Sequence, residues 1–390
     1  MTAAASRRPL REASWAERGS TFTIFLTMGM MTGAWAAALP ALKFKLDLSN
    51  LDLSIALTAL TGGSVLATIL AGIIAPRFGT GRATGFGAVA IILGLILPPL
   101  AQSLPQFAAA SFLLGAGVGS LDVSVNGHAG FIEQRWGGPI MSSFHGAFSV
   151  GGLGGAALGG AIAWAGWGAG AQLWCPAALV ALLNLAALPF LGRGPRSRPK
   201  GLGLAWPERT MLGLCAIVLL CFIIEGGMAD WSAVYLSSVT GASIGAAATG
   251  YAAFSITMAT GRLTGDRITH RFGPRRIVVG GAALAALGLG LAVAFPQTLV
   301  AALSFALVGI GAANIVPVGF SAATRMGSSP TAGVAVVATV GYAGFLSGPP
   351  LIGGVASLVG LRSGIACLAI AAALVSILGI VAMPAGRRKR

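Results

Sequence analysis

Long uninterrupted apolar runs, separated by short polar connections, dominate the pattern of hydrophobic and polar positions along the chain. A helix needs about 20 consecutive apolar residues to cross a bilayer. Runs near this length are predicted at residues 21–42, 53–76, 83–101, 106–128, 139–163, 171–191, 209–236, 243–264, 276–295, 298–322, 331–357 and 361–383. A transmembrane β-barrel would instead alternate apolar and polar residues over segments of about ten. The pattern therefore predicts an all-α membrane protein with twelve transmembrane helices.

The twelve runs fall into two sets of six around a polar, basic stretch that is rich in Pro and Gly. The predicted domains are an N-terminal tail, a first six-helix bundle, a linker, a second bundle and a C-terminal tail, at 1–20, 21–191, 192–208, 209–383 and 384–390. The fourth run, FLLGAGVGSLDV, is echoed by the tenth, FALVGIGAANIV. Weak similarity between halves is typical of repeat-built transporters, whose substrate lies near the midplane between the halves.

Composition and charge agree with a membrane location. Hydrophobic residues make up 56% of the chain and charged residues 9%, with a mean hydropathy of +0.86, whereas about a quarter of the residues of a soluble domain are charged. A net charge of +15 would suit a nucleic-acid partner, but the basic residues lie in the connections and tails. On the predicted topology, 22 of the 25 Lys and Arg fall on one side, leaving Lys43, Lys45 and Arg362 on the other. Positive charge marks the cytoplasmic side, so both termini and the linker are predicted there.

Ionisable side chains inside the apolar runs are the candidate functional groups, because a charge in lipid is kept only where it faces a protein interior or a wet cavity. Asp122 lies deep in the fourth run, and Asn126 follows it on the same helix face. Glu225 lies at similar depth in the seventh run. We assign proton coupling to Asp122 and Glu225. The alternative for Asp122 is a structural acid that caps a neighbouring helix or pairs with a histidine.

Further polar side chains are candidate contacts for a substrate, with hydrogen bonding between helices or an interface position as the alternative. They are Asn126, Asp230, Trp231 and Asn314. His145, in the fifth run, could pair with Asp122 or with Glu133, and we assign it to gating. The same run carries a ladder of glycines, Gly151, Gly155 and Gly159, which predicts a smooth strip for close helix packing.

Two connections resemble the loop signature of the major facilitator superfamily, in which glycines and basic residues surround an Asp-Arg pair. The copy between the eighth and ninth runs, which begins within the end of the eighth, is good, with Gly261, Arg262, Gly265, Asp266 and Arg267. The copy between the second and third runs keeps Gly72, Arg77, Gly79 and Arg82 but has Pro76 where the aspartate belongs. The resemblance covers essentially the whole chain. It implies two six-helix bundles and gating roles for Arg77, Arg262, Asp266 and Arg267.

The fourth run has a closer likeness. Its segment GSLDVSVN, from Gly119 to Asn126, resembles the Gly-x-Leu-Glu-x-x-x-Asn pattern of fucose-permease-type proton symporters. In that branch the acid carries the proton and the asparagine helps to hold the sugar. The stretches PIMSSFHGAFSVGG and EGGMADWSAVYL most resemble uncharacterised YbjJ-type permeases of the bacterial inner membrane. The symporters have a second acid in their first helix, and residues 21–42 contain no carboxylate.

These observations predict a secondary active transporter of the bacterial inner membrane that works by alternating access. It would take up a small polar solute, such as a sugar or related metabolite, together with protons, and it would act as a monomer. Alternatives are a proton-coupled exporter and a transporter-like membrane sensor. No Walker motif or metal cluster occurs in the sequence, so we expect no cofactor, no metal and no enzymatic activity.

Overall fold

The computed structural model describes residues 12–48, 50–196, 209–242, 244–327 and 329–383. The first bundle contains α1 (Trp15–Lys45), α2 (Asn50–Phe78), α3 (Thr80–Ile96), α4 (Leu104–Trp136), α5 (Met141–Trp164) and α6 (Ala169–Ala187), with short 3₁₀ turns η1 (Pro98–Leu100) and η2 (Leu188–Phe190). The second contains α7 (Arg209–Ser238), α8 (Ile244–Phe272), α9 (Pro274–Ala294), α10 (Thr298–Ala312), α11 (Ile315–Met326), α12 (Pro330–Val359) and α13 (Leu361–Ala382). The predicted all-α fold is confirmed.

Each predicted span corresponds to a helix, and the tenth is broken into α10 and α11. Within the described residues, eleven spans are long and apolar enough to cross a bilayer, and residues 298–326 count as one of them. The remaining predicted span corresponds to α8, which is 29 residues long but more polar than these eleven spans. The largest errors in the predicted boundaries lie at polar ends. Thus α1 begins six residues earlier than predicted, and α4 and α8 each end eight residues later, because their charged last turns remain helical beyond the apolar run.

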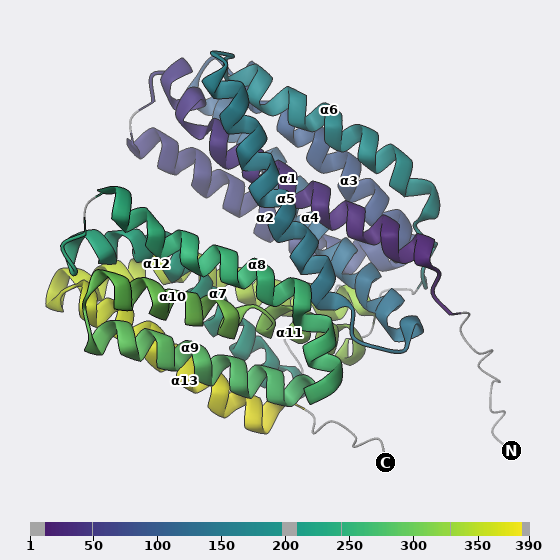
Figure 1. The fold of residues 1–390 in the computed structure, drawn as a ribbon. Helices are drawn as coiled ribbons and strands as arrows, with labels where there is room; N and C mark the ends of the chain where they lie inside the picture. Colours follow the sequence, from purple (N-terminus) through teal and green to yellow (C-terminus); the bar gives the residue numbers. More distant parts are fainter. Residues whose placement is uncertain (1–11, 49, 197–208, 243, 328, 384–390) are drawn as a thin grey trace, which may run out of the picture.

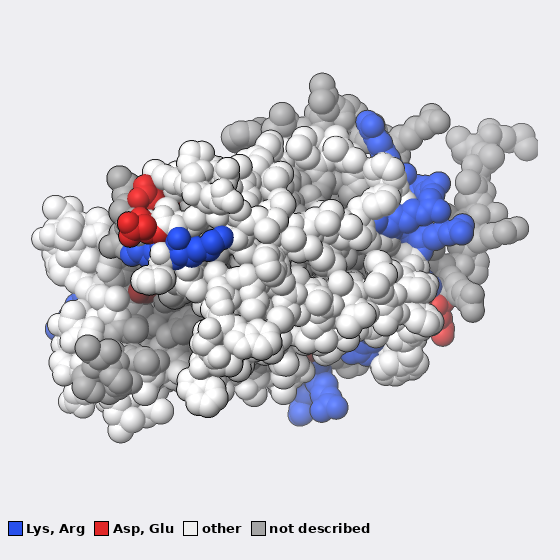
Figure 2. Space-filling view, turned by 90° about the horizontal axis from the view of Figure 1, so that it is seen from above, with Lys and Arg blue, Asp and Glu red and all other residues white. Residues whose placement is uncertain are grey.

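The two bundles lie side by side, and the start of α1 and the end of α13 are at the same end of the molecule (Figure 1). We call this the terminal end. Figure 2 shows Lys and Arg side chains gathered there, with further basic side chains along the lower edge of the view, and a smaller mixed group of acidic and basic side chains at the opposite end. The rest of the face between the two ends is uncharged. Apolar side chains are exposed at helical spacing along the helices, as on α2 at Leu66, Leu70 and Ile74. That arrangement suits a surface in contact with lipid.

The predicted glycine strip on α5 packs against α1 in the first bundle. A methyl group at Gly151 would lie 2.0 Å from the Leu26 carbonyl oxygen, and one at Gly155 would lie 1.9 Å from that of Met30. The contact is reciprocal, since a methyl group on Gly33 of α1 would lie 2.0 Å from the Gly152 carbonyl oxygen. Backbone-to-backbone packing of this kind holds α1 and α5 together as one unit.

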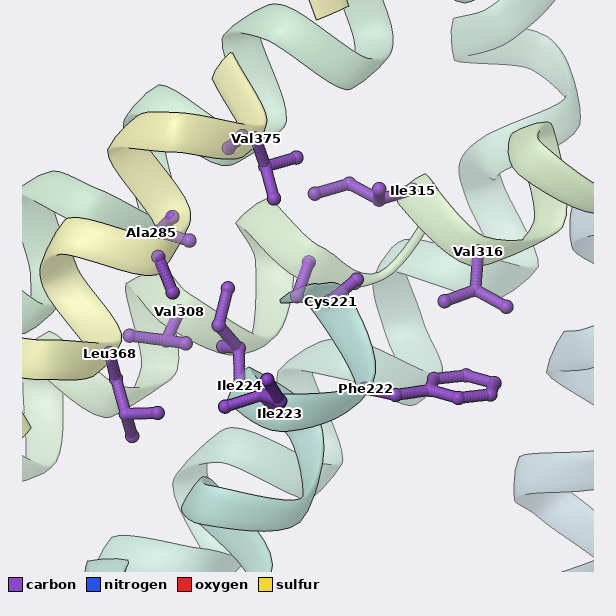
Figure 3. Packing of buried hydrophobic residues seen from close by; sticks show 14 of the residues in the cluster. Cys221, Phe222, Ile223, Ile224, Ala285, Val308, Ile315, Val316, Leu368 and Val375 are labelled. Carbon is purple, nitrogen blue, oxygen red and sulfur yellow. The ribbon is translucent and has the colours of Figure 1, made fainter. Parts of the chain in front are cut away.

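The core of the second bundle is built around α7. Side chains of Ile224, Val308 and Leu368, from three different helices, converge in it (Figure 3). The ring of Phe222, also a member of the cluster, points away from these three side chains (Figure 3) and packs against Tyr342 and Phe345 of α12. Since Phe222 is only three residues before Glu225, α7 presents one face to its bundle core and polar and aromatic groups to another.

Candidate functional site

Asp122 lies near the middle of α4 and is bonded from both bundles. Its Oδ1 accepts a hydrogen bond from Asn126 Nδ2 at 3.0 Å, and its Oδ2 accepts one from the Tyr342 hydroxyl on α12 at 3.1 Å. The next residue, Val123, forms a small apolar cluster with Ala71 of α2 and Ala335 of α12. Asp122 therefore lies at the interface between the bundles, held by two neutral donors.

Asn126 continues this chain of hydrogen bonds toward α5. Its Oδ1 lies 3.0 Å from His145 Nε2, so with the amide nitrogen facing Asp122, the imidazole nitrogen is the donor. His145 is buried between the rings of Phe25 and Phe320. Of the partners predicted for His145, neither Asp122 nor Glu133 is bonded to it directly. Asn126 connects it to Asp122 instead.

Glu225 and Arg262 form a second polar group at the same interface. Arg262 Nη2 lies 3.1 Å from Glu225 Oε2 and 3.3 Å from Oε1. The guanidinium also donates from Nε to the Ala313 carbonyl oxygen at 3.2 Å, and from Nη1 to Ser149 Oγ on α5 at 3.1 Å. Ser149 Oγ in turn donates to the His145 carbonyl oxygen. The two acids are thus joined through α5 by one continuous polar network, which we call the mid-depth site: Asp122, Asn126, His145, Ser149, Glu225, Arg262 and Tyr342.

The other predicted substrate contacts lie outside this network. Asn314 directly precedes α11 at the break after α10, and its side chain donates to the Gly261 carbonyl oxygen at 2.9 Å, within its own bundle. Asp230 is exposed. Trp231 packs on α12 at Gly353, and its buried indole nitrogen has no partner among the described residues. None of these three bonds directly to Asp122 or Glu225 in the described part of the chain.

A first set of bonds joins the bundles closer to the terminal end. Asp266 Oδ1 accepts from the backbone nitrogen of Ser143, in the first turn of α5, at 3.1 Å. Asp266 Oδ2 lies 3.8 Å from Arg18 Nη2. Arg18 is itself packed over the rings of Trp15 and Trp136. The predicted gating residue Asp266 thus contacts the first bundle at two points.

Glu133 forms a second set of bonds between the bundles on the terminal side of the mid-depth site. Its Oε2 accepts from the backbone nitrogens of Ile140 and Met141, at 2.9 and 3.0 Å. Its Oε1 accepts from the Ser321 hydroxyl and from Arg325 Nη2 of α11, the latter at 3.3 Å. Glu133 is 2% exposed, because α4 continues past the predicted turn and carries it into the interface. Asp266 and Glu133 together place two carboxylates at the positive N-terminal end of α5, a favourable position for negative charge.

The inter-bundle hydrogen bonds and ion pairs between described residues all lie either in the mid-depth site or between it and the terminal end. Helix packing agrees, since a methyl group at Gly127 of α4 would lie 2.9 Å from Thr331 Cα of α12. In the described part of the chain no three His, Cys, Asp or Glu side chains are grouped as a metal site requires. The two bundles are therefore closed against each other at the terminal end. The ionisable groups of the mid-depth site lie farther from that end than the closure does.

Comparison with known proteins identifies the family to which the chain belongs. Residues 21–326 match the sequence profile of the Major Facilitator Superfamily. An uncharacterised MFS-type transporter of Yersinia pestis is 35% identical over 90% of this chain and 92% of its own length. The chain belongs to the Major Facilitator Superfamily. Among solved structures, the superfamily transporter FucP in the outward conformation superposes with a TM-score of 0.77 at 15% identity, covering 94% of this chain and 98% of that one. A variant of the E. coli fucose:proton symporter FucP gives 0.76 at 14%, over 94% and 98%.

The protein is therefore a superfamily transporter and not an enzyme, and its fold is fucose-permease-like. The superfamily signature begins at the end of the predicted eighth span and was expected to continue into a connection. In the structure α8 extends to Phe272, so Gly261 to Arg267 are all helical, and Arg262 is 7% exposed beside Glu225. The polar residues of the signature ended the apolar run without ending the helix. Asp266 lies at the closure, and Arg77 and Arg267 are exposed.

Sequence reasoning missed several residues that the structure brings to the interface between the bundles, among them Ser149 and Arg18. Tyr342 reaches Asp122 from 220 positions away, and Ser321 and Arg325 reach Glu133 from more than 180. Tyr342 could have been noticed, because it is one of three tyrosines in the chain and lies in an apolar run. Its partner could not, since nothing in the local sequence specifies which helix α12 faces.

Proposed function

We propose that this transporter takes up a small polar solute together with protons, by alternating access, and that Asp122 is the residue whose protonation couples the two. The observation that carries the proposal is the setting of Asp122 between the bundles. Its two partners in the described chain are the neutral groups of Asn126 and Tyr342. A carboxylate without a cationic partner is costly in a low-dielectric interface, and a proton removes that cost.

The hydrogen bond from Tyr342 gives protonation a route to conformation. It crosses from α12 to α4, so it must be broken or remade when the bundles rock. An ionised Asp122 accepts it strongly, whereas a protonated Asp122 is a weaker acceptor. The charge of Asp122 would therefore bias the balance between the two access states. A ligand that binds the two states unequally would bias the same balance.

The solute class rests on likeness. The segment GSLDVSVN resembles the proton and sugar site of fucose-permease-type symporters, and the solved fucose:proton symporter shares the fold. Asp122 and Asn126 correspond to that segment's acid and asparagine. A sugar or related metabolite bound near them, between the bundles, is the solute that this likeness supports.

The orientation is part of the proposal. The gathering of Lys and Arg at the terminal end supports a bacterial inner-membrane protein with both termini in the cytoplasm (Figure 2). The terminal-end closure would then be the cytoplasmic gate. Cysteines introduced at Ser197 and Arg390, which lie outside the described residues, should both be shielded from an impermeant thiol reagent in intact cells. Labelling of either one from outside overturns this orientation.

The experiment that tests the function has two stages. A thermal-shift screen of the purified protein against metabolites identifies a ligand, since binding to the folded state alone raises stability. Proteoliposomes that contain one copy of the protein each are then given an inward or an outward proton gradient, which also tests whether a monomer suffices. Accumulation driven by an inward gradient supports uptake, accumulation that requires the opposite gradient shows an exporter, and transport indifferent to both gradients shows that the carrier is not proton-coupled.

A further inference from the structure

The guanidinium of Arg262 has partners of unequal strength. Its Nε is fixed to the Ala313 carbonyl oxygen at the α10–α11 break, and its Nη2 is held by both oxygens of Glu225. Among the described residues, its Nη1 is held only by the neutral hydroxyl of Ser149. Glu225 thus uses one nitrogen of the guanidinium and does not occupy the two-pronged edge that pairs best with a carboxylate. One strong donor is left with a weak partner.

That weak partner belongs to the other bundle. Ser149 lies on α5 and Arg262 on α8, two helices that pack across the interface. Movement of the bundles must therefore break this bond in each transport cycle, while the bonds to Ala313 and Glu225, both within the second bundle, can persist. Breaking it frees Nη1, already oriented by Nε and Nη2, for a group on a bound solute.

Charge balance indicates which group that is. When the site is empty, Glu225 and Arg262 cancel and an ionised Asp122 leaves one negative charge. When the site holds a monovalent anion and Asp122 is protonated, the same single negative charge remains. A neutral solute would leave Nη1 with no charged partner, and a cationic solute would be repelled by Arg262. Among ionisable neighbours, Asp122 faces Tyr342 on α12, with His145 of α5 beyond Asn126, and Cys221 lies one turn before Glu225.

We infer that the solute is a monovalent organic anion whose carboxylate bonds Nη1 of Arg262 in place of Ser149, while Asp122 carries the proton that enters with it. This inference rests on the proposed function and specifies its substrate class. Glu225 serves as a positioning residue that orients the guanidinium. By its negative charge it also keeps the affinity for the anion low enough for release.

The test uses pairs of sugars that differ only in an acid group: D-glucuronate with D-glucose, and D-galacturonate with D-galactose. Binding to the purified full-length protein is measured by thermal shift and by isothermal titration at pH 5.5 and pH 7.5. We expect an acid member to bind and its neutral partner not to bind. Affinity should fall by up to about tenfold per pH unit as Asp122 ionises, the limit for one linked proton.

Variants separate anion binding from a merely structural ion pair. Glu225→Gln removes the competing charge and should strengthen acid binding by about tenfold, the equivalent of about 1.4 kcal/mol. Arg262→Gln should abolish it. Ser149→Ala leaves no charge unpaired, so it should fold normally and bind the acid at least as tightly as the wild type. Arg271→Gln, which changes an exposed arginine on the same helix, is the matched control and should change nothing.

Three results overturn the inference: equal binding of acid and neutral members, no binding of either acid, or weaker acid binding in both Glu225→Gln and Ser149→Ala. Failure here is distinct from failure of the proposed function. If neutral sugars bind and are accumulated by a proton gradient, Asp122 coupling stands and the anion site does not exist. If the acids bind through Arg262 but transport ignores the gradient, the anion site stands and the coupling proposal is wrong.

Discussion

The two carboxylates of the mid-depth site are held in opposite ways. Asp122, in the first bundle, has neutral partners, and one of them comes from the second bundle. Glu225, in the second bundle, is paired with Arg262 of its own bundle. A paired charge can stay ionised throughout a cycle, whereas an unpaired one is stable at an interface only when it binds a proton or a counter-charge. The contrast teaches that the number of acids in a transporter does not give the number of coupled protons, because the partners decide which acid can change its charge.

The largest effect on the difference between the two acids is expected when the cation that pairs with Glu225 is removed. Arg262→Gln leaves a buried carboxylate unpaired, so the free energy of unfolding should fall by about 3–5 kcal/mol. The double variant Arg262→Gln with Glu225→Gln should recover most of that loss. Denaturant unfolding in detergent measures both. A double variant no more stable than the single one would show that Arg262 acts through Ala313 and Ser149 rather than through Glu225.

Asp122→Asn fixes the neutral form of the other acid while nearly preserving its shape. The variant should still bind and exchange the solute, but it should not accumulate it. With a gradient of two pH units, the accumulation limit of the wild type is about 100-fold for one proton, since each unit is worth about 1.4 kcal/mol. Solute uptake into proteoliposomes measures the ratio.

Glu225→Gln is the comparison for that experiment. It should reach the accumulation limit of the wild type, although tighter binding slows release of the solute. Normal accumulation by Asp122→Asn together with loss in Glu225→Gln would move the coupling site to α7 and reverse the contrast between the two acids.

A smaller effect is expected at the closure. Asp266→Asn removes the charge that faces Arg18 and weakens the bond from the Ser143 backbone nitrogen. The closed terminal end should lose about 1 kcal/mol, as for a hydrogen bond to a charged group made neutral. A thiol reporter near Arg135 should then react several-fold faster from the terminal side, and Arg271→Gln serves as the control. Unchanged reactivity would mean that Asp266 does not hold the closure.

The smallest effect is expected when the hydrogen bond from Tyr342 to Asp122 is removed. Tyr342→Phe deletes one neutral donor and should cost about 1 kcal/mol of stability when Asp122 is ionised, and less in an Asp122→Asn background. Unfolding of the four proteins of this double-mutant cycle measures the coupling. A cost as large as that of Arg262→Gln would show that a neutral partner holds its acid as firmly as a cation does.

Features that depend on a single helix could be predicted from the sequence, whereas contacts between helices distant in the sequence could not. Apolar runs locate the helices, and the spacing of Gly151 and Gly155 predicts their close packing, because both are properties of single helices. The burial of Glu133 could not be predicted, since it lies in a polar segment beyond the fourth apolar run and its partners Ser321 and Arg325 come from the other bundle. Arg262 lies at the end of the eighth run, but its pairing with Glu225 depends on how α7 and α8 meet. Asp122 was singled out from sequence alone, but its bond to Tyr342 depends on how α4 and α12 meet. The roles assigned to the site residues stay predictions.

The glycine contact between α1 and α5 has a mechanical consequence. With carbonyl oxygens and glycine Cα atoms in direct contact along several turns, the two helices can neither slide nor rotate separately without a clash. They behave as one rigid body. Arg18 and Ser143 lie at one end of this helix pair, and His145 and Ser149 lie further along it. A displacement that moves Arg18 and Ser143 away from Asp266 must also move Ser149 away from Arg262, so opening of the closure and rearrangement of the mid-depth site occur together.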